Sequence, residues 1–249
     1  MTKTLGLIGT GMIGGTLARL AVAAGLNVVL SNSRGPETLS DLVTELGGQA
    51  RAATPAESAE TGDLVVATVP LHAYKQLPAA ALAGKIVIDT MNYYPERDGR
   101  IAELDSDELT SSALVQRHLA GSRLVKAFNN IDFHRLSTSA RPAGAADRSA
   151  LPIAGDDPAA KAEVTALLDA LGYDAVDAGS LADSWRVEPG TPVYVQPYFP
   201  GQAPEGAGQD EAFRWFFETP GIPVPAAQVK ELIDSAVRGV AGGKLSPGA

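Results

Sequence analysis

Short apolar runs alternate with longer amphipathic segments along most of this 249-residue chain. The runs are rich in Val, Ile and Leu, which is typical of strands buried on both faces of a parallel sheet. We expect strands at residues 4–8, 27–30, 64–69, 86–89, 124–128, 151–154 and 174–176, and the clearest helices at residues 16–24 and 158–171. The alternation predicts an α/β fold with a Rossmann-type, doubly wound, mostly parallel sheet and a C-terminal helical extension.

A glycine-rich turn, Gly9-Thr10-Gly11-Met12-Ile13-Gly14, connects the first expected strand to the first expected helix. In a dinucleotide-binding loop the first glycine allows the tight turn, the second lets a pyrophosphate approach the backbone, and the third lets the helix pack on the strand. The helix N-terminus then offers free N–H groups and partial positive charge to the phosphates. Glycine-rich turns without a ligand are also common, but the complete strand–helix–strand context favours cofactor binding here.

The loop after the second expected strand, Ser31-Asn32-Ser33-Arg34, is followed by no acidic residue before Glu37. NAD sites usually place Asp or Glu there for the ribose 2′-hydroxyl, whereas NADP sites need donors and positive charge for the 2′-phosphate. Arg34 offers a permanently charged fork, and Asn and Ser side chains can donate to phosphate oxygens. The loop could also be a polar cap for the next helix, but its position favours NADP as the cofactor.

Composition and charge narrow the classes of function. A net charge of −9 argues against a nucleic-acid or membrane-surface partner, and the absence of cysteine excludes disulfides, thiolate metal sites and thiol catalysis. His72, His118 and His134 show no spacing of metal ligands. No apolar run approaches the roughly 20 residues that span a bilayer, and no signal-like segment opens the chain, so we expect a cytoplasmic protein with a small-molecule partner.

Residues 64–69 are expected to form the strand that is fourth in the doubly wound arrangement, on the far side of the first strand. There the strand order reverses and a ligand crevice opens. Three segments leave strands toward this crevice and supply candidate contacts to nicotinamide and substrate: Thr68-Val69-Pro70, Thr90-Met91-Asn92-Tyr93-Tyr94 and Asn129-Asn130. For each residue taken alone, core packing or a capped turn is an equally good explanation. Trp185, after the last expected strand, could cover a flat ring or belong to the core.

The chain changes character near residue 200. We expect a Rossmann-like NADP-binding domain with the substrate crevice at residues 1–200, and a linker with a C-terminal helical extension at residues 201–249. The extension carries an aromatic cluster and then an apolar stripe: Phe213, Trp215, Phe216 and Phe217, followed by Val229, Leu232, Ile233, Val237 and Val240. Such a tail must pack on its own domain or on a partner subunit, and a homodimer contact is the simplest interpretation.

Several motifs occur together in about the first 195 residues: GTGMIGG, the loop Ser31 to Arg34, Val69-Pro70, Val125-Lys126-Ala127-Phe128-Asn129-Asn130, Leu151 to Asp157 and Asp177 to Leu181. Their combination resembles the NADPH-dependent coenzyme F420 reductases, also called F420H2:NADP oxidoreductases, and their bacterial relatives. The resemblance extends to the cytosolic reductase domain of the six-transmembrane ferric reductases, which serves a flavin. It implies one Rossmann-like domain that holds NADP and a deazaflavin face to face, with hydride passing directly between the rings.

The resemblance also implies roles for individual residues. Together with the glycine turn and the loop positions, the expected cofactor-binding residues are Gly9, Thr10, Gly11, Met12, Ile13, Gly14, Ser31, Asn32, Ser33, Arg34, Thr68, Val69, Pro70, Asn92 and Ala127. Asn129, Phe128 and Asn92 are the expected catalytic residues, because they would flank the nicotinamide or the second ring. The expected cofactor is NADP, with coenzyme F420 or a flavin as co-substrate and with no metal.

Direct hydride transfer between two bound rings needs orientation, close approach and exclusion of water rather than an acid–base pair. Consistent with this, the Tyr-x-x-x-Lys spacing of short-chain dehydrogenases is absent. His72 or His134 could still protonate a reduced substrate, although a structural role fits each. Three functions therefore remain open: an NADPH-linked oxidoreductase of a deazaflavin or flavin, an NADPH-dependent reductase of a small imine, ketone or quinone, and a redox sensor that binds NADP without turnover.

Overall fold

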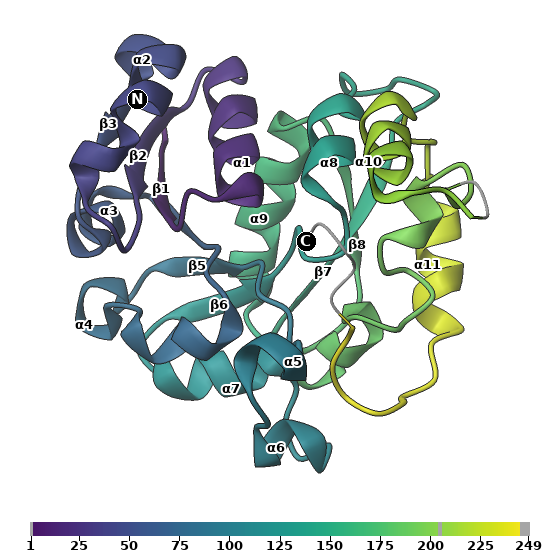
Figure 1. The fold of residues 1–249 in the computed structure, drawn as a ribbon. Helices are drawn as coiled ribbons and strands as arrows, with labels where there is room; N and C mark the ends of the chain where they lie inside the picture. The colour runs from purple at the N-terminus through teal and green to yellow at the C-terminus, as the bar shows by residue number, and fades with distance from the viewer. Residues whose placement is uncertain (1, 204–205, 245–249) are drawn as a thin grey trace.

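The computed structural model describes residues 2–203 and 206–244, which contain one eight-stranded sheet with helices on both faces (Figure 1). The strands are β1 Thr4–Ile8, β2 Asn27–Ser31, β3 Ala50–Ala52, β4 Leu64–Ala67, β5 Ile86–Asp89, β6 Arg123–Lys126, β7 Ala150–Gly155 and β8 Asp174–Asp177. Their order is β3-β2-β1-β4-β5-β6-β7-β8. Strands β1 to β6 are mutually parallel, β7 is antiparallel to β6, and β8 is parallel to β7. The predicted doubly wound α/β fold is confirmed, with β4 on the far side of β1.

The helices connect these strands and cover both faces of the sheet. The α-helices are α1 Met12–Ala23, α2 Ser40–Leu46, α3 Pro55–Thr61, α4 Ala79–Leu82, α5 Pro95–Asp98, α6 Ala102–Asp105, α7 Ser111–His118, α8 Phe133–Thr138, α9 Pro158–Ala170, α10 Gln209–Glu218 and α11 Ala226–Asp234. Five 3-10 helices complete the described part: η1 Pro36–Leu39, η2 Gly47–Gln49, η3 Leu71–Gln76, η4 Leu181–Val187 and η5 Gln196–Tyr198.

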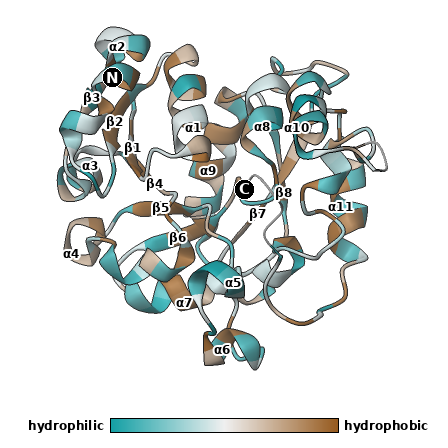
Figure 2. Ribbon diagram, viewed as in Figure 1, coloured by the Kyte–Doolittle hydropathy of each residue, from teal (hydrophilic) through white to brown (hydrophobic). Residues whose placement is uncertain are grey.

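The central strands are apolar on both sides, and successive residues face two separate core layers. Val66 and Ile88 belong to the layer that contains side chains of α1 and α9, whereas Val65 and Val87 belong to the layer with α3 and α7. Figure 2 shows the same pattern as strongly hydrophobic strands between helices of mixed character. Because successive side chains of a strand point to opposite faces, a nearly continuous apolar run is what burial on both faces requires.

Some element bounds differ from the expected ones. Helix α1 begins at Met12 instead of residue 16, so half of the glycine-rich turn forms the first helical turn. Strand β6 ends at Lys126, two residues before the predicted end, because the chain turns sharply at Phe128, where φ is +60°. Strand β3, with the sequence Ala-Arg-Ala, is too short and too mixed in character to give a periodic signal.

The C-terminal helix α11 belongs to the same core as the sheet. It packs on β7 and β8 through Val229 and Ile233, which are buried with the α1 and α9 layer. The apolar stripe is shorter than predicted, because α11 ends before Val237 and Val240, and these side chains are 84% and 87% exposed. The tail therefore packs at least partly on its own domain, and the boundary at residue 200 stays a prediction.

Helix α10 covers α8 with aromatic side chains. The rings of Phe216 and Phe133 lie 5.7 Å apart, and those of Phe217 and His134 lie 5.4 Å apart. Phe213 packs on Phe217 but remains 63% exposed. One side of α10 is thus anchored by aromatic contacts while an apolar part of it faces solvent.

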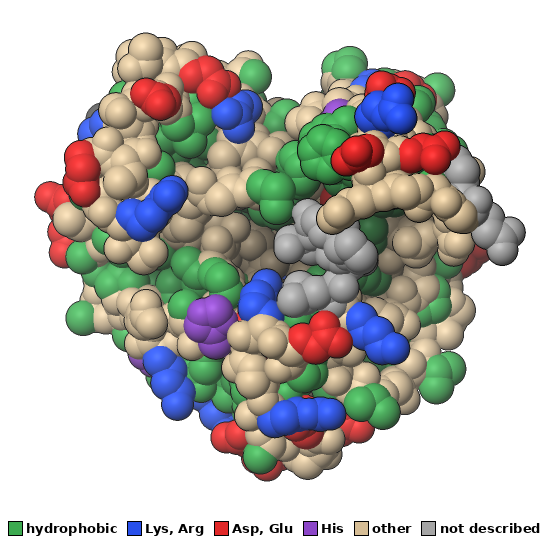
Figure 3. All heavy atoms as spheres, viewed as in Figure 1, with side chains coloured by type: hydrophobic (Ala, Val, Ile, Leu, Met, Phe, Trp, Pro, Cys, Tyr) green, Lys and Arg blue, Asp and Glu red, His purple; other side chains and the backbone are tan. Residues whose placement is uncertain are grey.

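The surface is hollowed between the N-terminal strands with α1 and the lobe that carries α8 and α10 (Figure 3). The carboxyl ends of β1, β4, β5 and β6 lie at one edge of the sheet, because Ile8 is in register with Ala67, Ala67 with Asp89, and Asp89 with Lys126. Every segment that leaves these strands therefore starts at the same edge. This is the crevice that the strand-order reversal predicts.

Candidate functional site

The first and last glycines of the phosphate turn are required by the protein itself. Gly9 has a φ of +99°, and a Cβ there would lie 2.2 Å from the carbonyl oxygen of Thr68. A Cβ on Gly14 would lie 2.2 Å from the Gly9 carbonyl oxygen, so only glycine lets α1 approach β1 this closely.

Gly11 is different, because a Cβ built on it would meet no protein atom within 4 Å. Its backbone is in the extended region, which most residues adopt, so neither sterics nor conformation requires glycine there. The open space next to Gly11 is therefore available to something outside the chain. Gly11 precedes the first residue of α1 and offers no side-chain cap, and the first turn has no acidic residue, so the first N–H groups of the helix remain available to an anion. The turn fits a pyrophosphate.

The loop after β2 uses two of its four predicted polar side chains for its own structure. The Ser31 hydroxyl is buried and donates to the Leu7 carbonyl oxygen at 2.8 Å. The Asn32 carboxamide oxygen accepts from the backbone N–H groups of Arg34 at 2.9 Å and Gly35 at 3.0 Å, which forms an Asx turn. Ser31 and the Asn32 oxygen therefore shape the loop, and a direct contact of these two side chains with the cofactor stays a prediction.

Ser33 and Arg34 remain as the polar side chains that the loop presents to solvent. Within the described residues, no ion pair involves Arg34. The nearby acid, Glu37, folds back so that its carboxylate lies against Gly35. A charged guanidinium held at the end of β2 by an Asx turn is an arrangement suited to a 2′-phosphate.

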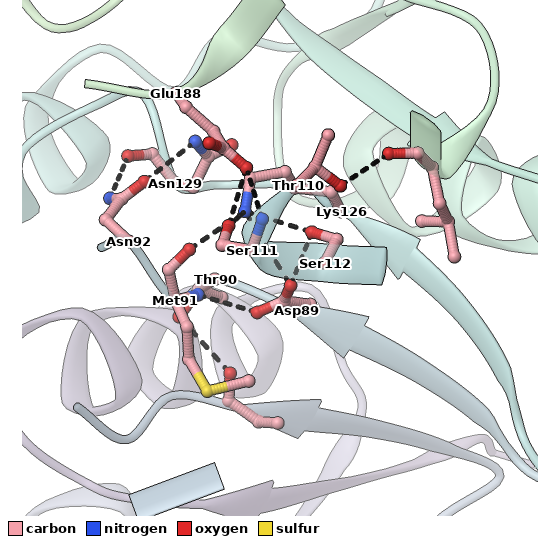
Figure 4. Close-up of polar contacts among 12 residues, drawn as sticks. Asp89, Thr90, Met91, Asn92, Thr110, Ser111, Ser112, Lys126, Asn129 and Glu188 are labelled. Carbon is pink, nitrogen blue, oxygen red and sulfur yellow. Dashed lines mark hydrogen bonds and ion pairs between the residues drawn. The ribbon is translucent and has the colours of Figure 1, made fainter. Parts of the chain in front are cut away.

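The structure brings Asn92 and Asn129 together at the mouth of the crevice (Figure 4). The Asn92 amide nitrogen donates to the backbone carbonyl of Asn129 at 2.8 Å, and the Asn129 amide nitrogen donates to the Asn92 side-chain oxygen at 3.1 Å. Asn129 also donates to the carbonyl of Val187 at 2.7 Å. The Asn129 side-chain oxygen is buried and accepts no hydrogen bond from the described residues.

Phe128 and Ala127 occupy different positions from those predicted. Both side chains are fully buried in the core, so the Phe128 ring does not face the crevice and cannot stack on a ligand there. The left-handed backbone of Phe128 instead turns the chain so that Asn129 reaches the mouth. Phe128 thus shapes the mouth through its backbone and not through its ring. On the opposite side of the mouth, Val69 is half-buried and Pro70 is exposed.

A buried charged network lies beneath the mouth, and it was missed from the sequence (Figure 4). The Lys126 ammonium donates to the Met91 carbonyl at 2.9 Å, to Ser112 Oγ at 3.0 Å and to Ser111 Oγ at 3.2 Å. The carboxylate of Asp89 lies 3.7 Å from this ammonium and accepts from Ser112 Oγ at 2.6 Å. A lysine and an aspartate at the ends of otherwise apolar strands were the signal that could have predicted it.

Glu188 completes this network from the segment after η4. Its carboxylate accepts from the Ser111 backbone N–H at 3.0 Å and from the Ser111 hydroxyl at 2.6 Å. The network therefore joins β5, β6, α7 and the segment after η4 at one buried point. It fixes the Met91–Asn92 backbone that forms one side of the mouth.

Two tyrosines extend the polar contacts of Asn92 toward the surface. The Asn92 amide nitrogen lies 3.4 Å from the hydroxyl of Tyr194, and this hydroxyl is hydrogen-bonded to that of Tyr94. Burial raises the pKa of both phenols above the ordinary value, so both remain protonated at neutral pH. Tyr194 lies 100 residues after Tyr94 in the chain, and no local motif marks it.

Trp185 lies apart from the Asn92–Asn129 pair. Because β7 runs antiparallel to β6, the carboxyl end of β8 lies at the opposite edge of the sheet from the crevice. Trp185 instead lines a separate cavity of about 90 Å³, where its ring packs against the guanidinium groups of Arg186 and Arg238. The structure gives no support to the prediction that Trp185 covers the nicotinamide, whereas Val187 and Tyr194, which also follow β8, do reach the two asparagines.

The histidines are placed apart from one another. His72 lies at the start of η3, with its Nδ1 3.1 Å from the buried carboxylate of Asp98. His134 belongs to the aromatic contacts between α8 and α10. The described residues contain no cluster of three or more His, Asp or Glu side chains suited to a metal ion. None of the described helices is long and apolar enough to cross a membrane.

The fold is similar to that of several solved proteins. Solved Rossmann-type oxidoreductases that are 15–19% identical, among them a 3-hydroxyisobutyrate dehydrogenase and an imine reductase, share the fold with TM-scores of 0.51–0.54. A hypothetical protein of Sinorhizobium meliloti, SMa0349, is 28% identical, with a TM-score of 0.68 over 78% of this chain and 93% of that one. An Arthrobacter sp. FB24 protein, described as a candidate F420-dependent NADP reductase, is 27% identical, with a TM-score of 0.62 over 74% and 87%.

The family follows from the sequence matches. Residues 4–93 match the family model described as NADP oxidoreductase coenzyme F420-dependent. The chain is also 30% identical over 186 residues to the metalloreductase STEAP3 of Rattus norvegicus, which covers 74% of this chain. The matches span 35% and 54% of the lengths of the two curated relatives found. These matches confirm the resemblance to this family of NADP-dependent oxidoreductases that the sequence indicated.

The contrast between the glycines generates a prediction. Gly11→Val should abolish binding of NADPH and NADH while the fold persists, because the added side chain fills space that the protein leaves open for the pyrophosphate. Isothermal titration calorimetry measures the binding, and urea unfolding measures the stability. Gly48→Val, at an equally open and exposed position in η2, is the matched control and should bind normally. A folded Gly11→Val protein with unchanged NADPH affinity would contradict this reading of the turn.

Proposed function

We propose that this chain transfers a hydride between NADPH and a planar ring acceptor, coenzyme F420 or a flavin-like molecule. The observation that carries the proposal is the locked pair of Asn92 and Asn129 at the carboxyl edge of the sheet, in the same crevice as the open phosphate turn. The family match over residues 4–93 supports an NADP-dependent reaction, and our proposal adds the planar ring as the hydride acceptor.

Bound NADPH would supply the hydride, and the contribution of the protein is to bind and orient it. The turn at Gly11 and the first N–H groups of α1 would hold the pyrophosphate, and Arg34 with Ser33 would hold the 2′-phosphate. Asn129 keeps one buried side-chain oxygen without a donor, an unused acceptor next to the mouth. Fixed side chains of this kind can supply much of the rate by positioning alone.

The cofactor preference is tested at Arg34. Arg34→Ala should weaken NADPH binding by about 1.5–3 kcal/mol, the range for a charge-assisted hydrogen bond, and should leave NADH binding nearly unchanged. Calorimetry with both nucleotides measures the difference. Arg117→Ala, which removes an exposed arginine of α7 that pairs with Glu108, is the matched control. A wild-type protein that prefers NADH would refute the assignment to NADP.

The ring acceptor is tested by stopped-flow oxidation of NADPH that carries deuterium at the transferred position. We expect a primary isotope effect with the deazaflavin or a flavin. Asn129→Ala should lower the rate by about 10- to 100-fold with little change in NADPH affinity, because a small misplacement of the reacting groups is costly. Asn27→Ala, at an exposed position at the start of β2, is the control. Wild-type protein that oxidises NADPH with no ring acceptor would exclude the proposal and favour a small imine, ketone or quinone, or a sensor without turnover.

We further propose that the protein works as a cytoplasmic homodimer joined through α10. The proposal is supported by the exposed rings of Phe213 (63%) and Phe217 (39%) on a helix that Phe216 anchors to Phe133 of α8 and Trp215 anchors to Phe199. Phe213→Asp should convert the dimer to a monomer, as measured by light scattering after size-exclusion chromatography. Val237→Asp, an equally exposed apolar position outside α10, should leave the dimer intact. A monomeric wild-type protein would end this part of the proposal.

A further inference from the structure

A pair of tyrosines lies next to the two asparagines of the mouth. Tyr94 follows β5 and Tyr194 precedes η5, and their hydroxyl groups are hydrogen-bonded to each other. The side-chain amide nitrogen of Asn92 connects the pair to the mouth, because it donates to the Asn129 carbonyl at 2.8 Å and lies 3.4 Å from the Tyr194 hydroxyl. Both rings are half-buried, so the pair is neither sealed in the core nor fully in solvent.

The two phenols have more hydrogen-bond donors than their contacts use. Each phenol owns one O–H proton, and an amide nitrogen can only donate. The bond between the two hydroxyls uses one of the two phenol protons, and the Asn92 contact brings another donor rather than an acceptor. The second phenol proton therefore has no acceptor among the described residues. The pair carries a donor that a bound molecule can use.

The surroundings hold the two rings in place. The Arg97 guanidinium lies 4.9 Å from the centre of the Tyr94 ring and donates to the Asn92 carbonyl at 2.9 Å. The same guanidinium donates to both oxygens of Asp98, each at 2.9 Å, and Asp98 accepts from the Tyr94 backbone N–H. Burial opposes ionisation of Asp98, but the bonds from Arg97, Tyr94 and His72 together lower its pKa, so it remains a carboxylate.

Tyr194 is fixed by unusual backbone geometry on its other side. Val195 has a φ of +56°, which is rare for a β-branched residue, and its N–H donates to the Asn130 carbonyl at 2.9 Å. A strained residue persists only where surrounding contacts determine it, and such residues concentrate at functional sites. The chain thus accepts local strain directly after the residue that brings the second phenol to Asn92.

We propose that the Tyr94–Tyr194 pair donates the proton that accompanies hydride transfer to the acceptor. The inference rests on the proposed function. In a two-electron reduction, the acceptor gains a new C–H or N–H bond from the hydride that NADPH loses, and the electron pair displaced within the acceptor takes up a proton at a ring nitrogen or an oxygen. That proton leaves a phenol O–H of the pair, and the resulting phenolate regains a proton from water, directly or through its partner. NADPH is oxidised, the acceptor is reduced, and the enzyme returns unchanged.

The chemistry of the pair suits this role. Both phenols are in their acid form at neutral pH, and burial, which raises their pKa, makes them weaker acids than an exposed tyrosine. Arg97 beside Tyr94 and the hydrogen bond from Tyr194 act against the effect of burial and lower the pKa of Tyr94, whereas Asp98, which pairs with Arg97, raises it. A purely structural pair would also close the mouth, so the test has to separate proton donation from positioning.

The experiment is single-turnover oxidation of NADPH with FMN or the deazaflavin, with wild type, Tyr94→Phe, Tyr194→Phe and the double variant. Phenylalanine keeps the ring packing and removes only the hydroxyl. The double variant should reduce the acceptor at least about tenfold more slowly, in line with general acid catalysis, with unchanged NADPH affinity. Added imidazolium or another small buffer acid should restore its rate in proportion to concentration. Tyr74→Phe, at a half-buried ring in η3, is the matched control and should behave as wild type.

Each outcome decides the question. A double variant as fast as wild type, or one whose slow rate no buffer acid restores, overturns proton donation by the pair while leaving the proposed function intact, provided that wild type shows the primary isotope effect. Wild type that oxidises NADPH with no ring acceptor overturns the proposed function and this inference together. Loss of rate in only one single variant, with rescue by buffer acid, identifies which phenol is the donor.

Discussion

The buried ammonium of Lys126 is the constraint on which the crevice depends. Removing a charge from water costs several kcal/mol unless its hydrogen-bonding groups are satisfied. Lys126 has three N–H donors and three oxygen acceptors within 3.2 Å, with the Asp89 carboxylate 3.7 Å away for charge balance. These partners come from the loop after β5 and from the first turn of α7. Because none of them can move without leaving the charge unpaired, the ammonium fixes the Met91 carbonyl and with it the position of Asn92.

From this point the mouth is assembled by hydrogen bonds between segments that are distant in sequence. Asn92 bonds Asn129, Asn129 bonds the Val187 carbonyl, and Ser111 bonds Glu188 one residue further along the chain. The segment after η4 is therefore tied to the crevice twice. The nucleotide end of the crevice works differently, because its shape comes from glycines and from side chains that bond their own loop. The crevice thus has a rigid polar side at Asn92 and Asn129 and an open backbone turn at Gly11.

Much of the fold could be predicted from the sequence, because strands buried on both faces leave continuous apolar runs and the glycine turn marks β1 and α1. The orientation of β7 could not, since an apolar run has no direction, and it places the carboxyl ends of β7 and β8 at the edge of the sheet opposite the crevice. The left-handed backbone at Phe128 was equally invisible, although it decides that the ring is buried and that Asn129 faces the mouth. Tyr194 could not be found either, because its partners are 100 or more residues away in the chain.

The C-terminal segment also bears on the site, which gives the extension a role beyond packing. After α11 the chain returns to the loop that follows β5, where the Gly243 N–H donates to the Tyr93 carbonyl at 3.0 Å. A Cβ on Gly242 would lie 2.7 Å from Pro95, and one on Gly243 would lie 2.5 Å from Pro189. Two consecutive glycines thus let the backbone lie directly on the segments that carry Tyr94 and Glu188. Because α11 is anchored in the core beside β7 and β8, it holds this return segment in place, and the geometry of the mouth depends on the extension as well as on the sheet.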